Sequence, residues 1–260
     1  MRTAMKCLCV LTLHAGVLLT SLAAADAETS APATYYVDGP GGDGFAEGGS
    51  DRRDHGIYTG TDNNIIDGCE FSHNRGFGIH IYTQAPESAD NNVIRNCYSH
   101  HNGIAGATIG VGAGNIAYNN ILVYNNVGIV VRGTNTRIYH NTIYGNKEGM
   151  NISNTTNAQV KNNIIYQSSA ITGRFKRGGA PTNTGLVLSN NLIDVEPLFV
   201  DATSGDFRLK AGSPAIDAGV ALKEVPADRN STPRPQGRAC DIGAYEFRGA
   251  TVEAVSAQPK

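Results

Sequence analysis

The chain has 260 residues, with 21 Lys and Arg, 23 Asp and Glu and a formal net charge of −2. So small a net charge gives no reason to expect a nucleic acid as partner. The 31 Gly and the absence of Trp suit short strands and tight turns and fit poorly with a helical bundle. The length is ample for one domain.

The first 27 residues have the pattern of a cleavable signal peptide. Arg2 and Lys6 give a positive end, residues 7–22 form an apolar run, and Ala25-Asp26-Ala27 offers small residues for cleavage. A single membrane anchor is the alternative, but the apolar run is short for it. We therefore predict a secreted or periplasmic protein that is not inserted in the membrane after cleavage. Residues 28–53 are predicted as an N-terminal strand and linker.

A short phrase rich in Asn, Ile and Gly recurs through residues 54–193. Asn74, Asn102, Asn125 and Asn146 take equivalent places in it, at steps of 28, 23 and 21 residues. This period, with β-branched alternation and Asn/Gly turns, is typical of a coiled strand. One such unit cannot bury its apolar face alone, whereas stacked units can. The pattern predicts an all-β fold, a single-stranded right-handed parallel β-helix, and we expect a monomer.

Alignment of the repeats places similar residues in columns. Alternation along each strand predicts that four apolar columns point inward. These columns are Ile66/Ile94/Ala117/Ile138/Val160, Phe71/Ser99/Leu122/Ile143/Ile165, Ile79/Ala107/Ile129/Met150 and Ile81/Ile109/Val131/Ile152. A further column, Cys69/Cys97/Asn120/Asn141/Asn163, is expected at a bend. There the amides either stack into a hydrogen-bonded ladder or simply serve turns, because Asn tolerates the left-handed conformation.

Three cysteines remain beyond the predicted signal peptide: Cys69, Cys97 and Cys240. Cys69 and Cys97 fall on neighbouring rungs, about 4.8 Å apart in a parallel stack, which is within disulfide range. Two buried thiols are favoured over a bridge, because side chains of parallel neighbours point the same way. The bridge stays open as the alternative, and Cys240 is left unpaired.

From Asp194 the repeat pattern changes. Because an open stack exposes free edge hydrogen bonds, we predict terminal coils and a C-terminal cap over residues 194–247 and a flexible tail over residues 248–260. Six aspartates lie in this segment, and turn or capping duty explains them. Calcium is the one cofactor considered, and no metal ligand set is assigned.

Three stretches carry a resemblance to a known family. The rung Asp54 to Tyr82 resembles the repeats of the pectin-lyase-like superfamily, and "PLFVD…GSPAIDAG…DIGAYEF" resembles the C-terminal region of many secreted bacterial β-helix proteins. "TYYVDGPGGDG" (Thr34 to Gly44) is similar to the first strand of pectate-lyase- and chondroitinase-B-like members. The resemblance implies the fold and a polysaccharide partner. Only Phe45 to Asp54 separates this strand from the "HGIY" rung, so coils that carry catalytic groups in relatives are missing.

Uronate lyases need a base and a positive group, or calcium, that neutralises the substrate carboxylate. Two outward stripes beside the third column supply such residues: Tyr58/His80/Thr108/Val130/Asn151 and Tyr82/Gly110/Arg132/Ser153. His80 and Arg132 are the candidate catalytic residues. The candidate substrate-binding residues are Tyr58, Tyr82, His55 and Asn151. An ordinary solvated face is the alternative interpretation.

Two further sets of residues are weighed against this site. The stripe Asp67/Arg95/Tyr118/Tyr139/Lys161 is a second candidate site, for which an ion-paired face covered by aromatic rings is the favoured alternative. His73 with His101 is interpreted as a surface pair without a third metal ligand. The first functional hypothesis is lyase-type β-elimination on an acidic glycan. The second is a non-catalytic protein that binds glycan or supports the cell envelope.

Overall fold

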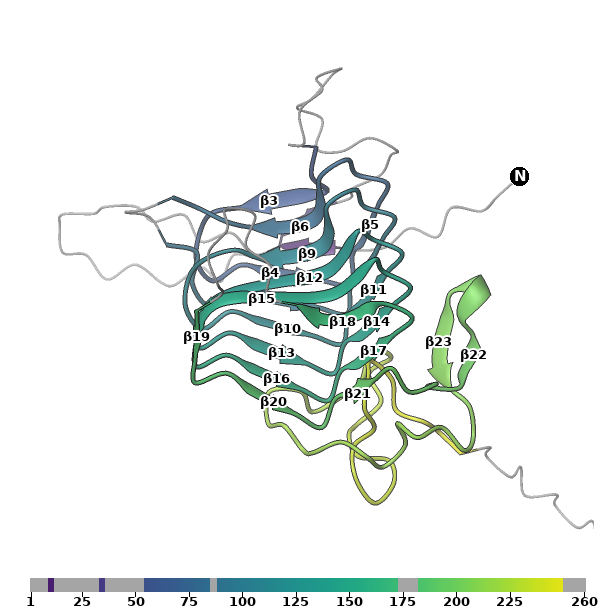
Figure 1. Ribbon diagram of the computed structural model, residues 1–260. Helices are drawn as coiled ribbons and strands as arrows, with labels where there is room; N and C mark the ends of the chain where they lie inside the picture. The colour runs from purple at the N-terminus through teal and green to yellow at the C-terminus, as the bar shows by residue number, and fades with distance from the viewer. Residues whose placement is uncertain (1–8, 12–32, 36–53, 85–87, 173–181, 250–260) are drawn as a thin grey trace, which may run out of the picture.

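The computed structural model describes residues 9–11, 33–35, 54–84, 88–172 and 182–249. The chain winds through these residues in stacked coils, and each complete coil adds one short strand to each of three sheets (Figure 1). The predicted signal peptide, apart from Cys9–Leu11, and most of the predicted linker and tail lie outside the described residues. Those predictions remain predictions.

The first sheet has eight strands, and those from β4 to β20 run parallel in register. Its β1 pairs antiparallel with both β2 and β4. The strands are β1 (Cys9–Leu11), β2 (Ala33–Tyr35), β4 (Ile65–Asp67), β7 (Val93–Arg95), β10 (Ile116–Tyr118), β13 (Arg137–Tyr139), β16 (Gln159–Lys161) and β20 (Val187–Ser189).

The other two large sheets are parallel throughout. The six-stranded sheet contains β5 (Glu70–Ser72), β8 (Tyr98–His100), β11 (Ile121–Val123), β14 (Thr142–Tyr144), β17 (Ile164–Tyr166) and β21 (Leu192–Ile193). The seven-stranded sheet contains β3 (Ile57–Thr59), β6 (Phe77–Ile81), β9 (Ala105–Ile109), β12 (Val127–Thr134), β15 (Glu148–Thr156), β18 (Ser169–Thr172) and β19 (Asn183–Thr184). A hairpin of β22 (Phe199–Asp201) and β23 (Asp206–Leu209), joined by the 3-10 turn η1 (Ala202–Ser204), follows.

The predicted inward columns are confirmed. Ile66, Ile94 and Ala117 are register neighbours, and the same column continues to Val160. The members of all four columns are at most 1% exposed, and all except Ser99 form one continuous apolar core along the stack. At about 0.8 kcal/mol for each buried CH₂ group, this column packing is the main source of stability.

The bend between the first and second sheets uses two residues with different duties. The first adopts a left-handed conformation, as in Asn119 with φ 55° and Asn162 with φ 58°. The second belongs to the predicted amide ladder: Asn120 N and Nδ2 both donate to Asn141 Oδ1, at 3.0 and 2.9 Å. Asn141 repeats the arrangement with Asn163. The ladder is therefore confirmed, and the turn chemistry proposed as its alternative operates one residue earlier.

A column of glycines marks the start of the seven-stranded sheet. A Cβ on Gly78, Gly106 or Gly128 would lie 2.7, 2.9 or 2.5 Å from the carbonyl oxygen of the glycine one coil further on. Any side chain here would push the coils apart, because real Cβ atoms do not approach backbone so closely. The coils can close at this corner only with glycine in the column.

The prediction for the cysteine pair is half wrong. Cys97 and Cys240 are buried and take part in no disulfide, so no bridge joins Cys69 to Cys97. Cys69, however, is disulfide-bonded rather than a thiol. The sulfur partner of Cys69 therefore does not come from the neighbouring rung.

The segment after β21 packs along the side of the stack. Phe199, Phe207 and Leu209 cover the outer face of the six-stranded sheet at Val123 and Ile164. On the outer face of the eight-stranded sheet, Val225 packs beside Ile116 and Tyr139. The segment therefore wraps around the corner between these two sheets.

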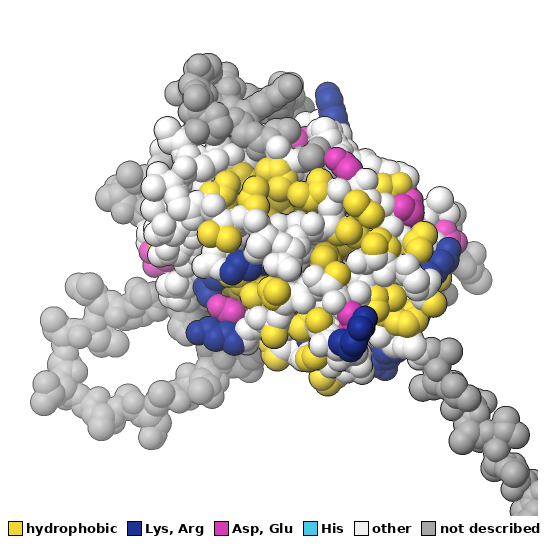
Figure 2. Space-filling model, turned by 60° about the horizontal axis from the view of Figure 1, so that its bottom comes forward, with side chains coloured by type: hydrophobic (Ala, Val, Ile, Leu, Met, Phe, Trp, Pro, Cys, Tyr) yellow, Lys and Arg dark blue, Asp and Glu magenta, His cyan; other side chains and the backbone are white. Residues whose placement is uncertain are grey.

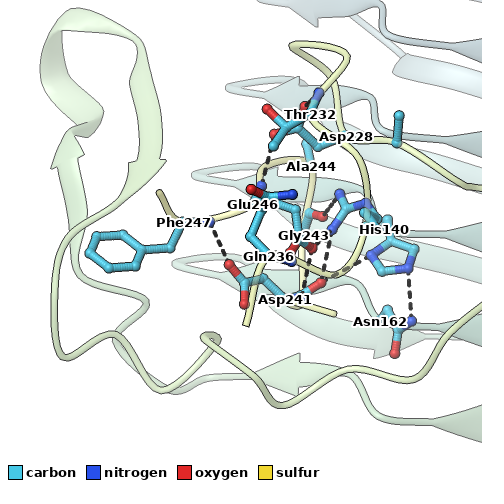
Figure 3. Close-up of polar contacts among 12 residues, drawn as sticks. His140, Asn162, Asp228, Thr232, Gln236, Asp241, Gly243, Ala244, Glu246 and Phe247 are labelled. Atoms are coloured by element: carbon cyan, nitrogen blue, oxygen red, sulfur yellow. Dashed lines mark hydrogen bonds and ion pairs between the residues drawn. The ribbon is translucent and has the colours of Figure 1, made fainter. Parts of the chain in front are cut away.

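A buried polar network fastens this segment to the stack (Figure 3). His140 Nδ1 donates to Asp241 O over 3.1 Å, while Asn162 Nδ2 donates to His140 Nε2 over 2.9 Å. Burial, and secondarily the charge of Arg234, hold the pKa of His140 well below its ordinary value. Burial likewise raises the pKa of Asp241 to about 6. The neutral imidazole is thus the form that fits this corner.

The last coil keeps apolar side chains in contact with solvent. Leu188 continues the first inward column from Val160, yet it is 47% exposed, and Val187 is 44% exposed. Figure 2 turns the lower end of the stack forward and shows hydrophobic side chains spread over this face. In the described part of the chain, no helix has the length and apolar character needed to span a membrane.

Candidate functional site

The predicted outward stripe exists as a row of register neighbours on the seven-stranded sheet. Tyr58 pairs with His80, His80 with Thr108, and the row continues through Val130 to Asn151. Its two ends differ in exposure. Tyr58 is 51% exposed, whereas Thr108, Val130 and Asn151 are 3, 9 and 8% exposed. The accessible part of the stripe is therefore its N-terminal end.

Five rings meet at that end, and we call them the aromatic cluster: His55, Tyr58, Phe77, His80 and Tyr82. His80 is its centre, with ring centroids 4.2 Å from Phe77, 4.6 Å from His55, 5.0 Å from Tyr58 and 5.6 Å from Tyr82. The rings of Phe77 and Tyr82 stack on His80, and those of His55 and Tyr58 meet it edge-on. Both are favourable geometries for aromatic pairs.

Phe77 is the member of the cluster that the sequence did not reveal. Strict alternation would turn it inward with Ile79. Gly78 and Ile79 are instead both buried, and a Cβ on Gly78 would meet Ser99 and Asn102 at the corner. Phe77 therefore lies on the outer face, where it packs on Ala105, Val127 and Val130. The glycine column was the available signal for this irregularity.

The orientation of His55 is set by the backbone. His55 Nδ1 accepts a hydrogen bond from Phe77 N over 3.1 Å, so its proton is on Nε2 in the neutral ring. A Cβ on Gly76 would lie 2.3 Å from that Nδ1, so glycine is required beside the imidazole. His55 is 5% exposed, so it supports the other rings of the cluster and offers little surface to a ligand.

His80 is held in its neutral form. Burial, then the charges of His55 and Arg132, lower the pKa of His80 from 6.5 to about 3. Its Nδ1 is buried and has no hydrogen-bond partner among the residues that the structure describes. A proton acceptor works best with a pKa near the working pH, so His80 is a weak base in this state. A bound anion beside it would oppose both repulsive charges and raise this pKa.

The second predicted stripe places Tyr82 and Arg132 on either side of Gly110. A Cβ on Gly110 would lie 2.9 Å from Tyr82 Cδ2, so the tyrosine ring lies over the glycine as expected. Arg132 is half-buried, and its charge reaches His80. Two rungs separate Tyr82 from Arg132, or about 10 Å, a span of about two sugar rings.

Asn151 is the predicted site residue that lies apart from the others. Three rungs of the sheet separate it from His80, which is about 14 Å. Its Nδ2 donates to Glu148 Oε1 over 3.1 Å. The structure therefore brings His55, Tyr58, His80 and Tyr82 into one cluster with Arg132 nearby, and leaves Asn151 outside it.

Parts of the other two polar sets form the expected structural contacts. Arg95 pairs with Asp67 over 2.8 Å and donates to Tyr118. His73 stacks on His101 with ring centroids 5.1 Å apart. Among the residues that the structure describes, no group of three or more His, Cys, Asp or Glu side chains is placed to hold a metal ion.

Comparison with known proteins agrees with this architecture. The family model described as "Right handed beta helix region" matches residues 49–195, more than half of the chain. The chain belongs to this family. Three parallel sheets and the family match thus confirm the predicted β-helix.

No curated protein matches the β-helix chain. Among solved structures, the chain is similar to one titled "Crystal structure of pectate lyase Pel9A", with 15% sequence identity and a TM-score of 0.42. The match covers 75% of this chain and 68% of that one. At this identity it says nothing about substrate or activity.

The depressed pKa of His80 predicts how the stability of the β-helix depends on pH. The unfolded chain takes up a proton below about pH 6.5, whereas folded His80 does so only near pH 3. Stability is therefore greatest above pH 6.5 and falls as the pH drops. From pH 7 to 5 this group alone removes about 2 kcal/mol from the free energy of unfolding.

His80→Phe tests this, because a phenyl ring fits among the same neighbours and does not titrate. Urea unfolding of both proteins at pH 7 and pH 5 gives two differences in stability. We expect the loss on acidification to be about 2 kcal/mol smaller in the variant. Equal losses would mean that His80 is not desolvated.

Proposed function

We propose that this β-helix binds an acidic polysaccharide along the outer face of its seven-stranded sheet. The observation that carries the proposal is the aromatic cluster, which ends in the half-exposed ring of Tyr58. Aromatic rings present flat apolar surface with a polar edge, and the C–H faces of pyranose rings stack on such surfaces. Stacked coils provide a long track that suits a polymer.

Arg132 favours an acidic polymer over a neutral one. Its guanidinium lies close enough to depress the pKa of His80, so a carboxylate placed between the two would be attracted by the arginine and would favour protonation of the imidazole. Arginine presents planar, paired N–H donors that match a carboxylate. The separation of Tyr82 from Arg132 lets one sugar stack while a neighbouring sugar is clamped by its acid group.

If the aromatic cluster binds the polysaccharide, removal of its exposed tyrosine should lower the affinity. Tyr58→Ala removes the exposed ring of the cluster without touching the inward columns, and we expect the affinity for a uronate oligomer to fall about tenfold, since one such ring contributes about 1 kcal/mol or more. Isothermal titration with oligomers of pectate, alginate and chondroitin sulfate measures it. Tyr166→Ala, which removes a half-buried ring on the six-stranded sheet, is the matched control. Equal affinities of both variants and the parent protein would contradict the site.

Lyase-type β-elimination is the second candidate, with the half-buried imidazole of His80 as the base. In this reaction the imidazole takes the proton beside the substrate carboxylate, the bond to the 4-linked oxygen breaks, and that oxygen leaves with a proton. The remaining uronate then contains a C4–C5 double bond. The bound carboxylate would have to raise the pKa of His80 for this step to be efficient. Without such a rise the protein is a binding protein only.

An absorbance assay separates the two candidates. Elimination creates a conjugated uronate that absorbs at about 232 nm, and base removal costs on the order of 10² in rate. We expect His80→Ala and Arg132→Ala each to show that loss if the protein is a lyase. Assays run with and without Ca²⁺ test calcium as a cofactor. Binding with a flat absorbance trace on all three polymers would leave the binding function alone.

We also propose that the protein acts outside the cytoplasm after removal of residues 1–27. The support is the pattern of positive end, apolar run and small residues near Ala27. N-terminal sequencing of the protein recovered from medium or periplasm tests it. A recovered protein that still starts at Met1 would contradict cleavage.

A further inference from the structure

A second concave site lies on a different sheet from the aromatic cluster. A pocket of about 610 Å³ opens between the outer face of the eight-stranded sheet and residues 221–224 of the C-terminal segment. Its polar lining comes from Arg137, Tyr139, Gln159, Lys161, Lys223 and Glu224. Its volume falls within the range of about 300–1,000 Å³ that is usual for small-molecule sites.

Register on neighbouring strands builds the floor of this pocket. Arg137 of β13 lies opposite Gln159 of β16, and Tyr139 lies opposite Lys161. The wall is fixed because Val225 is buried against Ile116 and Tyr139. A folded sheet and a packed segment therefore hold these groups at set positions, and loop movement is not needed to form the site.

The pocket has an excess of positive charge. Arg137 is held in place, because it donates to Gly114 O over 2.9 Å and pairs with Glu224 over 3.3 Å. Lys161 and Lys223 form no ion pair with any residue that the structure describes. Three cations therefore face one carboxylate. Such an excess attracts an anion and strengthens hydrogen bonds to it.

Neutral donors and acceptors surround these cations. Tyr139 donates its hydroxyl proton to Gln159 Oε1 over 3.0 Å, which leaves the Gln159 NH₂ group available to donate. The amide side chains of Asn135 and Asn157 are exposed at the rim. Groups of this kind match the hydroxyls of a sugar, whereas a small inorganic anion would use the lysines alone.

We propose that this pocket binds a short acidic saccharide, with a carboxylate or sulfate group between Lys161 and Lys223 and with ring hydroxyls on Gln159 and the rim amides. The site extends the proposed function, because it would let one β-helix hold two separate parts of an acidic polymer on two of its sheets. Linked sites of this kind raise overall affinity without any new contact. The binding itself does not depend on the aromatic cluster.

Isothermal titration with trigalacturonate, neutral galactotriose, a chondroitin sulfate disaccharide and inorganic sulfate tests the proposal. The full chain is used in the Tyr58→Ala background, so that binding at the aromatic cluster does not hide binding at this pocket. We expect trigalacturonate to bind and galactotriose to bind at least about tenfold more weakly. The relative affinity of the disaccharide shows whether the site prefers sulfate or carboxylate.

Charge variants give opposite expected results within the same pocket. Lys161→Gln combined with Lys223→Gln should weaken trigalacturonate binding about tenfold or more, and Glu224→Gln should strengthen it several-fold by removing the one negative charge. Thermal unfolding of each variant shows that it is folded. Lys147→Gln, which changes an exposed lysine between β14 and β15 that does not line the pocket, is the matched control.

Three results would overturn the proposal. These are equal binding of the charged and neutral trimers, unchanged binding in the double lysine variant, and sulfate binding as tightly as trigalacturonate. The last would show a simple anion site. Persistence of binding in the Tyr58→Ala background, together with its loss in the lysine variant, separates this site from the function proposed for the seven-stranded sheet.

Discussion

Replacing Asn141 by Ala will lower the free energy of unfolding by about 3–5 kcal/mol, because the change leaves several buried groups without partners at about 1–3 kcal/mol each. Asn141 Oδ1 accepts from both N and Nδ2 of Asn120. Its Nδ2 donates to Ala117 O and to Asn163 Oδ1. The residue is fully buried, so no solvent replaces these bonds.

The consequence should spread along the ladder. Each amide in it donates to the next coil and accepts from the previous one, so removal of one member disturbs both neighbours. Polar networks in a low-dielectric interior respond in this coupled way. Weakened protection of the backbone amide hydrogen of Asn120, whose acceptor is Asn141 Oδ1, should accompany the fall in stability and can be followed by hydrogen exchange.

Asn126→Ala is the matched control for this variant. Asn126 lies in the same part of the stack and is exposed, so its replacement should change stability by no more than about 0.5 kcal/mol. Urea unfolding of both variants at pH 7 measures the two effects. A drop of similar size in both would show that the ladder contributes nothing beyond an ordinary Asn.

The fold could be predicted because the size and branching of the side chains repeat with the period of the coils. Once Ile66, Ile94 and Ala117 are placed in equivalent positions, alternation along the strands predicts that they point into the core. The observed register places the same residues in one column. The identity of the ladder residues followed in the same way. A parallel coil repeats its environment at each winding, so one correctly aligned residue places its whole column.

The site could be predicted only in part, because its geometry depends on departures from that repeat. Phe77 packs on the outer face with Ala105 and Val127, whereas strict alternation assigns it to the inner side together with the buried Ile79. Burial of Thr108 and Asn151 likewise depends on what packs above the sheet, which no period encodes. The pairing of His80 with Tyr58, a feature of register alone, was foreseen.

The packing of the C-terminal segment against the coils could not be predicted from the sequence repeat. Its contacts join residues far apart in sequence, such as His140 with Asp241 and Asn119 with Ala227. Those contacts use the side chains of the left-handed corner residues, which point out of the stack where a second layer can reach them. The sequence shows that corners exist, but it does not show which of them a later segment covers.

Glu246→Gln will detach this segment from the stack without unfolding the coils. Glu246 and Arg234 form an ion pair with side chains that are 0 and 1% exposed. Glu246 Oε1 also accepts from Asp241 N, and Oε2 accepts from Gln236 N. Removal of one partner from a buried pair leaves an uncompensated charge, which costs about 3–5 kcal/mol. Arg234 carries that charge in the variant.

The cost should appear locally, because the core columns of the coils lie elsewhere. Parts of a protein open with separate free energies, and an element bound by few contacts opens first. Gly243 N donates to Asn162 O and Ile242 N donates to Ala215 O. Exchange of these two amide hydrogens should become on the order of 10² to 10³ times faster in the variant. Amide hydrogens of β11 and β14 should change far less.

Asp206→Asn provides the comparison within the same segment. It removes the carboxylate of another arginine pair, but Arg208 is 59% exposed in that pair, so the loss should stay below about 1 kcal/mol. The contrast between the two variants separates burial from the mere presence of a salt bridge. If Asp206→Asn released the segment as readily as Glu246→Gln, the buried network would not be what fastens the C-terminal segment to the β-helix.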